Sequence, residues 1–157
     1  MKSTIAVSLL LAVASADAFP ANDPWHSHCQ MKTTFTGSCD EVFAGLDKTV
    51  KNIQDPGKGI YAVHEEVANK SIWSTRTTPA KHYVDDQLFE ISSGNDTQCA
   101  IVAKTRSRTY SYYDYDTNYC NLWNIFRFSG MKFTEPVIED CRWQPSIAFR
   151  ESICNKY

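Results

Sequence analysis

Two cationic and then two aromatic side chains occupy every second position of one stretch of the chain: Arg106, Arg108, Tyr110 and Tyr112. Residues two apart in a strand point to the same face, so these side chains would form one outward row. Guanidinium groups bind carboxylate or sulfate oxygens through paired hydrogen bonds. We therefore name these four residues as possible contacts of an anionic group or another ligand. In the alternative, which we favour, the arginines form structural ion pairs with Asp114 and Asp116.

The segment Asp114-Tyr115-Asp116-Thr117-Asn118 imitates the start of a calcium-binding loop, where alternating oxygens coordinate the cation. The rest of the loop does not fit. Tyr119 stands where a glycine is needed, and Ile125 stands where a bidentate glutamate belongs. We interpret these carboxylates as parts of a turn and a helix cap.

Four histidines are candidates for metal binding or catalysis. His26 and His28 could share copper or zinc. We favour a mobile N-terminal segment here, with the neighbouring Cys29 in a disulfide. His64 and His82 stand without a serine, cysteine or aspartate at a recognisable motif spacing. We predict no catalytic residue, no metal site and no cofactor.

Two pairs of adjacent carboxylates, Glu65-Glu66 and Asp85-Asp86, have the chemistry of glycoside cleavage. That reaction requires two carboxyl groups that face one cleft. Neighbouring residues of a strand point to opposite faces of a sheet. We therefore expect these carboxylates to lie on solvated faces.

Six cysteines indicate an oxidising compartment and three disulfides: Cys29, Cys39, Cys99, Cys120, Cys141 and Cys154. No two of them are separated by the two residues usual in structural zinc sites. The sequence leaves the pairing open, although Cys141 and Cys154 could close a local loop.

The first residues have the pattern of a cleavable signal peptide. Lys2 precedes an apolar run from Ile5 to Ala14, and Ala16-Asp17-Ala18 fits the cleavage rule. The run is about ten residues long, half of what a membrane-spanning helix needs. We predict a signal peptide over residues 1–18, one secreted, extracellular domain over residues 19–157, and no membrane span.

The charge and the turns of the chain restrict its partners and modifications. A formal net charge of -2 at pH 7 gives no electrostatic reason to expect a nucleic-acid partner. Two sequons, Asn69-Lys70-Ser71 and Asn95-Asp96-Thr97, fall in polar breaks between apolar segments. We predict Asn69 and Asn95 as exposed glycosylation sites.

Capping residues and apolar spacing predict two helices. Ser38-Cys39-Asp40-Glu41 is a capping-box pattern, and apolar residues at helical spacing follow it until Asp55-Pro56-Gly57. Thr117 or Asn118 is predicted to cap a second, aromatic helix, which Ser129-Gly130 ends.

Between these helices the apolar residues alternate with a period of two, which predicts four antiparallel strands over residues 60–68, 72–78, 84–92 and 99–113. The predicted fold class is α+β. An antiparallel sheet of about four to six strands packs against one long and one shorter helix, and disulfides staple the domain.

Three segments carry a family resemblance: Tyr83-Val84-Asp85-Asp86, Thr105-Arg106-Ser107-Arg108 and Asp114-Tyr115-Asp116-Thr117-Asn118. They resemble an uncharacterised bacterial and plastid domain family, which pairs a Phe-x-Asp-Asp strand with an Arg-Ser-x-Ser-Arg strand and an Asp-x-Gly-x-Asn helix start. The chain departs from that pattern at Tyr83 and Thr105, and its third segment, which includes Thr117, contains no glycine. The resemblance implies the order strand, strand, helix and brings no known activity.

Two further resemblances concern the mature chain and one short motif within it. The mature chain resembles small secreted six-cysteine proteins of ciliates and other protists. Tyr115-Asp116-Thr117-Asn118-Tyr119 is weakly similar to the Thr-Asp-Tyr motif late in lipocalins, with a different residue order. The Gly-x-Trp motif near the lipocalin N-terminus has no counterpart around Trp25.

Since no catalytic motif stands out, the leading functional hypothesis is a non-enzymatic secreted binding module for a small-molecule, apolar or lipid ligand or an extracellular partner. One alternative is a hydrolytic enzyme whose acid and histidine are brought together by the fold. Another is a structural or surface-coat protein that assembles through aromatic residues.

Overall fold

A computed structural model of the protein describes residues 18–157, so the predicted signal peptide lies outside the described residues except for Ala18. The elements follow in the order β1 (His28–Thr36), α1 (Cys39–Asn52), β2 (Ile60–Val67), β3 (Ser71–Thr77), β4 (Val84–Gly94), β5 (Gln98–Ser107), α2 (Thr117–Phe128), β6 (Val137–Cys141) and α3 (Arg150–Cys154). A turn of 3₁₀ helix precedes α3. The predicted α+β class is confirmed.

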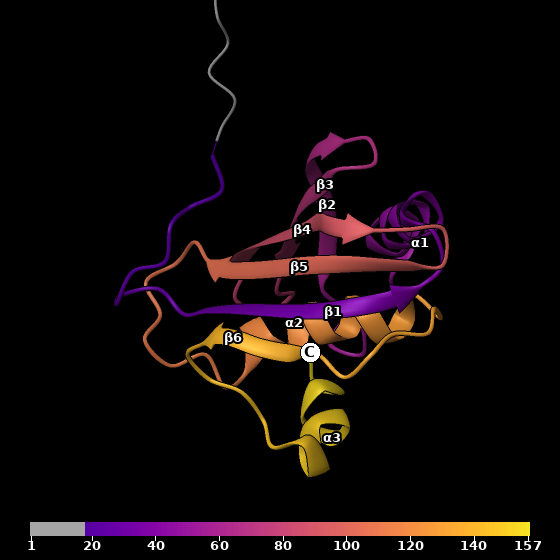
Figure 1. Cartoon of the computed structure of the whole chain (residues 1–157). Helices are drawn as coiled ribbons and strands as arrows, with labels where there is room; N and C mark the ends of the chain where they lie inside the picture. The colour runs from indigo at the N-terminus through magenta and orange to yellow at the C-terminus, as the bar shows by residue number, and fades with distance from the viewer. Residues whose placement is uncertain (1–17) are drawn as a thin grey trace, which may run out of the picture.

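The strands form one six-stranded antiparallel sheet in the order β2-β3-β4-β5-β1-β6. Short turns join β2 to β3 and β4 to β5, whereas β1 inserts between β5 and the late strand β6. In Figure 1, β4, β5, β1 and β6 run nearly side by side, and β2 and β3 turn away from them. This rotation is the ordinary twist of a sheet.

Helix α1 begins at the predicted capping box. The Glu41 backbone N–H donates to Ser38 Oγ at 3.3 Å, and the Ser38 backbone N–H donates to the Glu41 carboxylate at 2.9 Å. Both bonds satisfy donors that a bare helix end would leave open. The buried side of the helix then consists of Val42, Phe43, Leu46 and Val50.

The face of the sheet that α2 covers is apolar at one end, which we call the apolar half. Its buried side chains include Phe35, Ile72, Phe89, Ile101 and Phe126. The Phe126 ring lies 5.5 Å from the Phe35 ring and 6.1 Å from the Phe89 ring, measured between centroids. This packing joins α2 to the middle of the sheet.

Further along the same strands, the same face is polar, and we call this region the polar half. Its buried side chains are Ser74, Arg76, Asp85, Gln87, Thr105 and Ser107 from the sheet, with Asn118 and Asn121 from α2. Strand β5 shows the change, because Ile101 and Ala103 are followed on the buried face by Thr105 and Ser107. The polar half ends where β4 begins and β5 ends.

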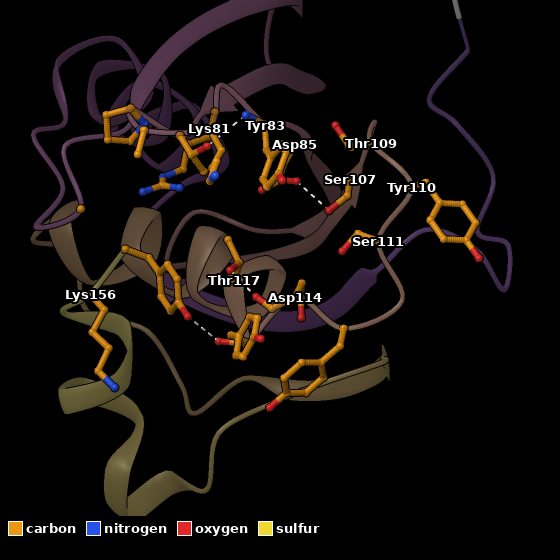
Figure 2. A pocket seen from close by; sticks show the side chains of 18 of the residues that line it. Lys81, Tyr83, Asp85, Ser107, Thr109, Tyr110, Ser111, Asp114, Thr117 and Lys156 are labelled. Carbon is orange, nitrogen blue, oxygen red and sulfur yellow. Dashed lines mark hydrogen bonds between the residues drawn. The ribbon is translucent and has the colours of Figure 1, made fainter.

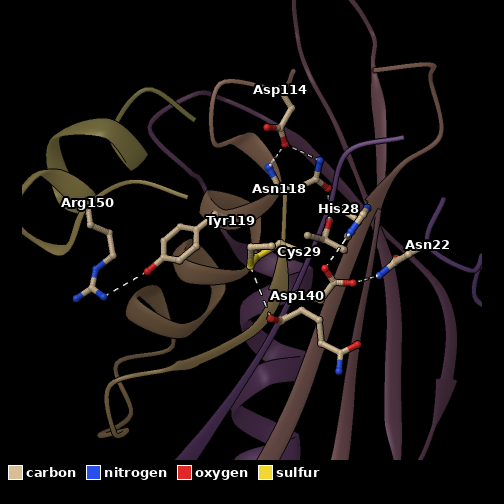
Figure 3. The surroundings of a disulfide bond; sticks show 11 residues. Asn22, His28, Cys29, Asp114, Asn118, Tyr119, Asp140 and Arg150 are labelled. Carbon is tan, nitrogen blue, oxygen red and sulfur yellow. Dashed lines mark hydrogen bonds and ion pairs between the residues drawn. A yellow bond between two sulfur atoms is a disulfide. The ribbon is translucent and has the colours of Figure 1, made fainter. Parts of the chain in front are cut away.

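Three disulfides connect elements that are distant in sequence. Cys29–Cys141 joins β1 to β6, Cys39–Cys99 joins α1 to β5, and Cys120–Cys154 joins α2 to α3. Figure 3 shows the first of these beside β1. The local pair considered from the sequence, Cys141 with Cys154, is wrong, because the pairing of β1 with β6 places Cys141 opposite Cys29.

Two expectations about strands are also wrong. His28 and Cys29, expected in a mobile N-terminal segment, instead begin β1, which has hydrogen-bonded neighbours on both sides. Strand β5 ends at Ser107, six residues before the predicted end at Tyr113, because the chain turns there toward α2.

Within residues 18–157, no helix has the length and apolar character needed to cross a membrane.

Candidate ligand-binding pocket

A cavity of about 640 Å³ opens at the end of the polar half. Its walls come from the turn before β4 (residues 78–83), the segment between β5 and α2 (109–115), and residues 156–157. Figure 2 shows Lys81, Tyr83 and Asp85 on one side of the opening and Lys156 on another. Three separate chain segments therefore enclose one space.

Six tyrosines line this cavity, which we call the tyrosine pocket: Tyr83, Tyr110, Tyr112, Tyr113, Tyr115 and Tyr157. Tyr112, Tyr113 and Tyr115 keep half or more of their surface exposed, at 59%, 50% and 66%. Single exposed rings are common on protein surfaces, but several exposed rings at one place usually mark an interaction site.

Neighbouring side chains hold these rings in place. The centroid of the Tyr113 ring lies 4.5 Å from that of Tyr115 and 4.7 Å from that of Trp143. The Arg142 guanidinium lies 3.9 Å from the centroid of the Tyr112 ring, a cation–π contact. The pocket therefore presents its aromatic surfaces with few free rotations left to lose on binding.

The floor of the tyrosine pocket contains a buried carboxyl group, that of Asp85. One oxygen accepts a hydrogen bond from Ser107 Oγ at 2.7 Å, and the other accepts one from Asn121 Nδ2 at 2.8 Å. Burial raises the pKa of Asp85, and these two hydrogen bonds oppose that rise without cancelling it. Asp85 therefore holds its proton to a higher pH than an ordinary aspartate.

Asp114 is the second carboxyl group of the floor. Its Oδ2 accepts hydrogen bonds from the backbone N–H and the side-chain amide of Asn118, at 2.9 Å and 2.7 Å (Figure 3). Its Oδ1 is buried and has no hydrogen-bond partner among the described residues. The Asn118 amide also donates to Ser107 Oγ at 2.9 Å, so a short chain of hydrogen bonds connects Asp114 to Asp85.

The predicted capping role is confirmed for Asp114, which accepts from the first turn of α2, while Asp116 at the N-cap position makes no side-chain cap bond. Tyr115 and Asp116 have φ angles of 56° and 69°, in the left-handed region that favours glycine. The Tyr157 hydroxyl donates to the Tyr115 carbonyl at 2.7 Å. This bond helps to hold the strained turn that forms one wall of the pocket.

Arg76 lines the pocket beside Asp85, and its charge is already neutralised. Its Nε donates to Asp55 Oδ2 at 2.6 Å, and both side chains are almost fully buried. The same carboxylate oxygen accepts from the Tyr61 hydroxyl at 2.7 Å. This ion pair is therefore part of the polar half, and Arg76 Nη1 is buried there without a hydrogen-bond partner among the described residues.

The structure separates the four residues predicted as ligand contacts. Tyr110 and Tyr112 line the tyrosine pocket, and the Tyr110 ring stacks on the Trp25 ring with centroids 6.0 Å apart. Arg106 and Arg108 lie on the other face of β5, paired with Asp23 and Asp86.

The expected ion pairs of these arginines with Asp114 and Asp116 are therefore wrong. Alternation along β5 carries both arginines to the face opposite α2. The Arg106 guanidinium lies 2.5 Å from Asp23, and Arg108 makes two hydrogen bonds with Asp86, at 2.8 Å and 2.7 Å. Both guanidinium groups are already engaged.

The expectation that Asp85 and Asp86 lie on solvated faces is also wrong, since their exposed fractions are 3% and 0%. They do point to opposite faces, but each face supplies donors. Asp85 faces Ser107 and Asn121, and Asp86 accepts from Trp73 Nε1 at 2.8 Å and from Arg108. Glu65 and Glu66 are exposed as expected.

No histidine of the described chain lines the tyrosine pocket. His26 Nδ1 lies 2.9 Å from Asp23, His28 Nε2 lies 3.3 Å from Asp140, and the His64 ring contacts Trp73 with centroids 4.3 Å apart. His82 lies in the turn before β4, with a φ angle of 54°. Among residues 18–157, no three His, Cys, Asp or Glu side chains are grouped so that they could hold a metal ion.

Sequence reasoning missed Asp85, Ser107 and Asp114 as pocket residues. One signal was present, because the buried face of β5 changes from Ile101 and Ala103 to hydroxyl residues. Hydroxyls at core positions indicate a polar interior, which proteins maintain mainly where a network or a ligand needs it. The position of α2 over that face is not readable from spacing.

Comparisons of the chain with protein-family models, with curated proteins and with solved structures find no match.

Proposed function

We propose that this protein is a secreted, glycosylated binding module that holds a small ligand in the tyrosine pocket. The observation that carries the proposal is one cavity of about 640 Å³ that combines exposed tyrosine rings with a buried polar floor. Binding sites for small molecules are mostly concave, about 300–1,000 Å³ in volume, and lined by aromatic groups with a few convergent polar ones.

The cysteines and the sequons support the extracellular part of the proposal. Three disulfides tie the described chain together, which is usual for proteins of oxidising compartments. Asn69 and Asn95 both lie in exposed turns between strands. The Asn95 side-chain oxygen accepts hydrogen bonds from Thr97, and both asparagines are accessible to a glycosylating enzyme.

The electrostatics favour a small ligand over a nucleic acid. Arg106 and Arg108, the cationic pair on the sheet, are engaged by Asp23 and Asp86, so they offer no basic stripe for phosphates. Lys81 and Lys156 stand apart at the rim of the pocket. A ligand inside the pocket therefore meets tyrosine rings and only two separated lysine charges at the rim.

Native mass spectrometry of the protein purified from its secreting cells, compared with the denatured mass, tests this function. We expect extra native mass that denaturation releases. A Tyr112→Ala/Tyr113→Ala variant should lose it, while Phe128→Ala, an exposed ring at the far end of α2, should keep it. Equal native and denatured masses, together with no effect of the double variant on binding of any added compound, would rule out the proposal.

A second function, hydrolysis, is favoured by one specific observation. Asp85 and Asp114 line the same pocket, and burial raises the pKa of Asp85. Two carboxyl groups held in different environments can divide the roles of general acid and general base. Turnover of p-nitrophenyl esters or glycosides that disappears in both Asp85→Asn and Asp114→Asn would support an enzyme, and turnover equal in all three proteins would exclude this pair.

A further inference from the structure

We propose that the ligand of the tyrosine pocket is a neutral carbohydrate. This inference rests on the proposed binding function and names its ligand class. Three observations carry it: a buried carboxylate oxygen without a donor, charges of both signs in the lining of the pocket, and tyrosine rings fixed with their surfaces exposed.

The floor of the pocket needs a hydrogen-bond donor. Asp114 is 9% exposed, and its Oδ2 already accepts two hydrogen bonds from Asn118, whereas Oδ1 has no partner among the described residues. A buried acceptor left without a donor costs about 1–3 kcal/mol. A sugar hydroxyl at the floor would bring a donor to the Asp114 side chain without bringing a charge.

The charges around the pocket are of both signs and do not favour an ion of either sign throughout. Lys81 and Lys156 stand at the rim and repel cations, while Asp114 at the floor repels anions. A neutral ligand with several hydroxyl groups avoids both repulsions. It also exchanges hydrogen bonds with exposed tyrosine hydroxyls of the lining, such as those of Tyr112 and Tyr113, which are donors and acceptors at once.

The tyrosine rings suit one face of a sugar ring. A pyranose exposes C–H groups on its faces and hydroxyls around its edge, so it packs flat on an aromatic ring while its edge reaches polar groups. Tyrosine offers the same combination of an apolar body and a polar tip. Tyr113 is braced by Tyr115 and Trp143, so this surface already exists before a ligand arrives.

A lipid ligand fits the same pocket less well. An acyl chain makes no hydrogen bonds, and it would cover Asp85, Ser107 and Asp114 with hydrocarbon. Covering polar groups in this way carries a desolvation cost that an acyl chain does not repay. The chemistry of the floor therefore favours a hydroxylated ligand.

Saturation-transfer NMR and calorimetry on the full mature protein test the inference. Its own asparagine-linked glycans are removed first, so that they do not compete. The probes are soluble oligosaccharides of glucose, mannose, galactose and N-acetylglucosamine, with tetradecanoate and choline as the lipid and cation probes. We expect at least one oligosaccharide to bind saturably and neither of the other two probes to bind.

Variants localise that binding. Tyr113→Ala and Asp114→Asn should each weaken it at least tenfold, and the matched aromatic control Phe128→Ala should leave it unchanged. Should Asp114→Asn fail to fold, Tyr113→Ala decides alone, because its half-exposed ring is not a core side chain.

The outcomes separate the ligand class from the function. Pocket-dependent binding of tetradecanoate or choline, with no oligosaccharide bound, overturns the carbohydrate and leaves the binding module standing. Oligosaccharide binding that Tyr113→Ala does not affect also overturns the inference. No binding of any probe, with equal native and denatured masses, overturns both the inference and the proposed function.

Discussion

The apolar half and the polar half are built from the same strands and the same helix, yet they differ in nearly every buried side chain. Phe35, Phe89 and Phe126 fill the first, whereas Arg76, Asp85 and Asn118 occupy the second. Apolar burial stabilises a fold by about 25 cal/mol per Å². A hydrogen bond exchanged with water contributes only about 0.5–1.5 kcal/mol net. The apolar half therefore holds the domain together, and the polar half shapes the tyrosine pocket.

The largest expected effect comes from a single ring in the apolar half. Phe126→Ala removes a fully buried side chain that packs against Phe35, Phe89 and Phe133. We expect the free energy of unfolding to fall by about 3–5 kcal/mol. Phe128→Ala, two residues further along α2 and exposed, should change it by less than about 0.5 kcal/mol. Urea denaturation of the oxidised protein measures both, and equal losses would remove the distinction between the two positions.

The pH dependence of stability distinguishes two carboxyl groups inside the polar half. Burial tends to raise the pKa of Asp55, but the charge and hydrogen bond of Arg76 outweigh it and leave that pKa below its usual value. For Asp85, burial prevails and the pKa is raised. Asp55 therefore contributes stability that is lost as the pH falls below about 4. The contribution of Asp85 to stability changes with pH in the opposite direction, because the ionisation of Asp85 above that pH opposes folding.

In the wild type, ionisation of Asp85 should lower the free energy of unfolding as the pH rises from about 4 through the raised pKa of Asp85. We expect Asp85→Asn to abolish this decrease. The slope of unfolding free energy against pH should differ from wild type by up to about 1.4 kcal/mol per pH unit in that window. Urea midpoints from pH 4 to pH 8 measure the slope. Asp40→Asn, at an exposed carboxyl group, is the control, and identical slopes in wild type and Asp85→Asn would contradict the buried titration.

The smallest effects compare the two helix starts. Ser38→Ala removes the capping box of α1 and should cost about 1 kcal/mol. Asp116→Gly should instead stabilise the protein by up to about 1 kcal/mol, because Asp116 makes no cap bond and glycine adopts a positive φ without strain. Thermal unfolding in parallel measures both changes. A loss in Asp116→Gly would show that its carboxylate contributes to the turn in a way the backbone angles do not explain.

Elements defined by local signals were predictable from the sequence. The capping box at Ser38 and the apolar spacing after it placed α1, and turn residues separated β2, β3, β4 and β5. These features depend on residues only a few positions apart. Local physical rules are therefore enough to place them.

Elements that depend on distant partners were not predictable. Strand β1 pairs with β5 and β6, and its disulfide to β6 spans 112 residues. The pocket has the same origin, because Tyr110 and Tyr112 line it while Arg106 and Arg108 are drawn to carboxylates on the other face. Whether a polar side chain is buried depends on what packs over it, and spacing alone does not contain that information.

The hydrogen bond from Tyr157 to the Tyr115 carbonyl has a consequence for the order of folding. It joins residues 42 positions apart, and the Cys120–Cys154 disulfide holds the segment that carries Tyr157 against α2. Contacts between distant positions carry a larger loop-closure entropy than the hairpins, so they tend to form later. The pocket is thus complete only after oxidation has secured the end of the chain. The affinity for the proposed ligand would then distinguish a finished molecule from one whose sheet has formed but whose Cys120–Cys154 disulfide has not.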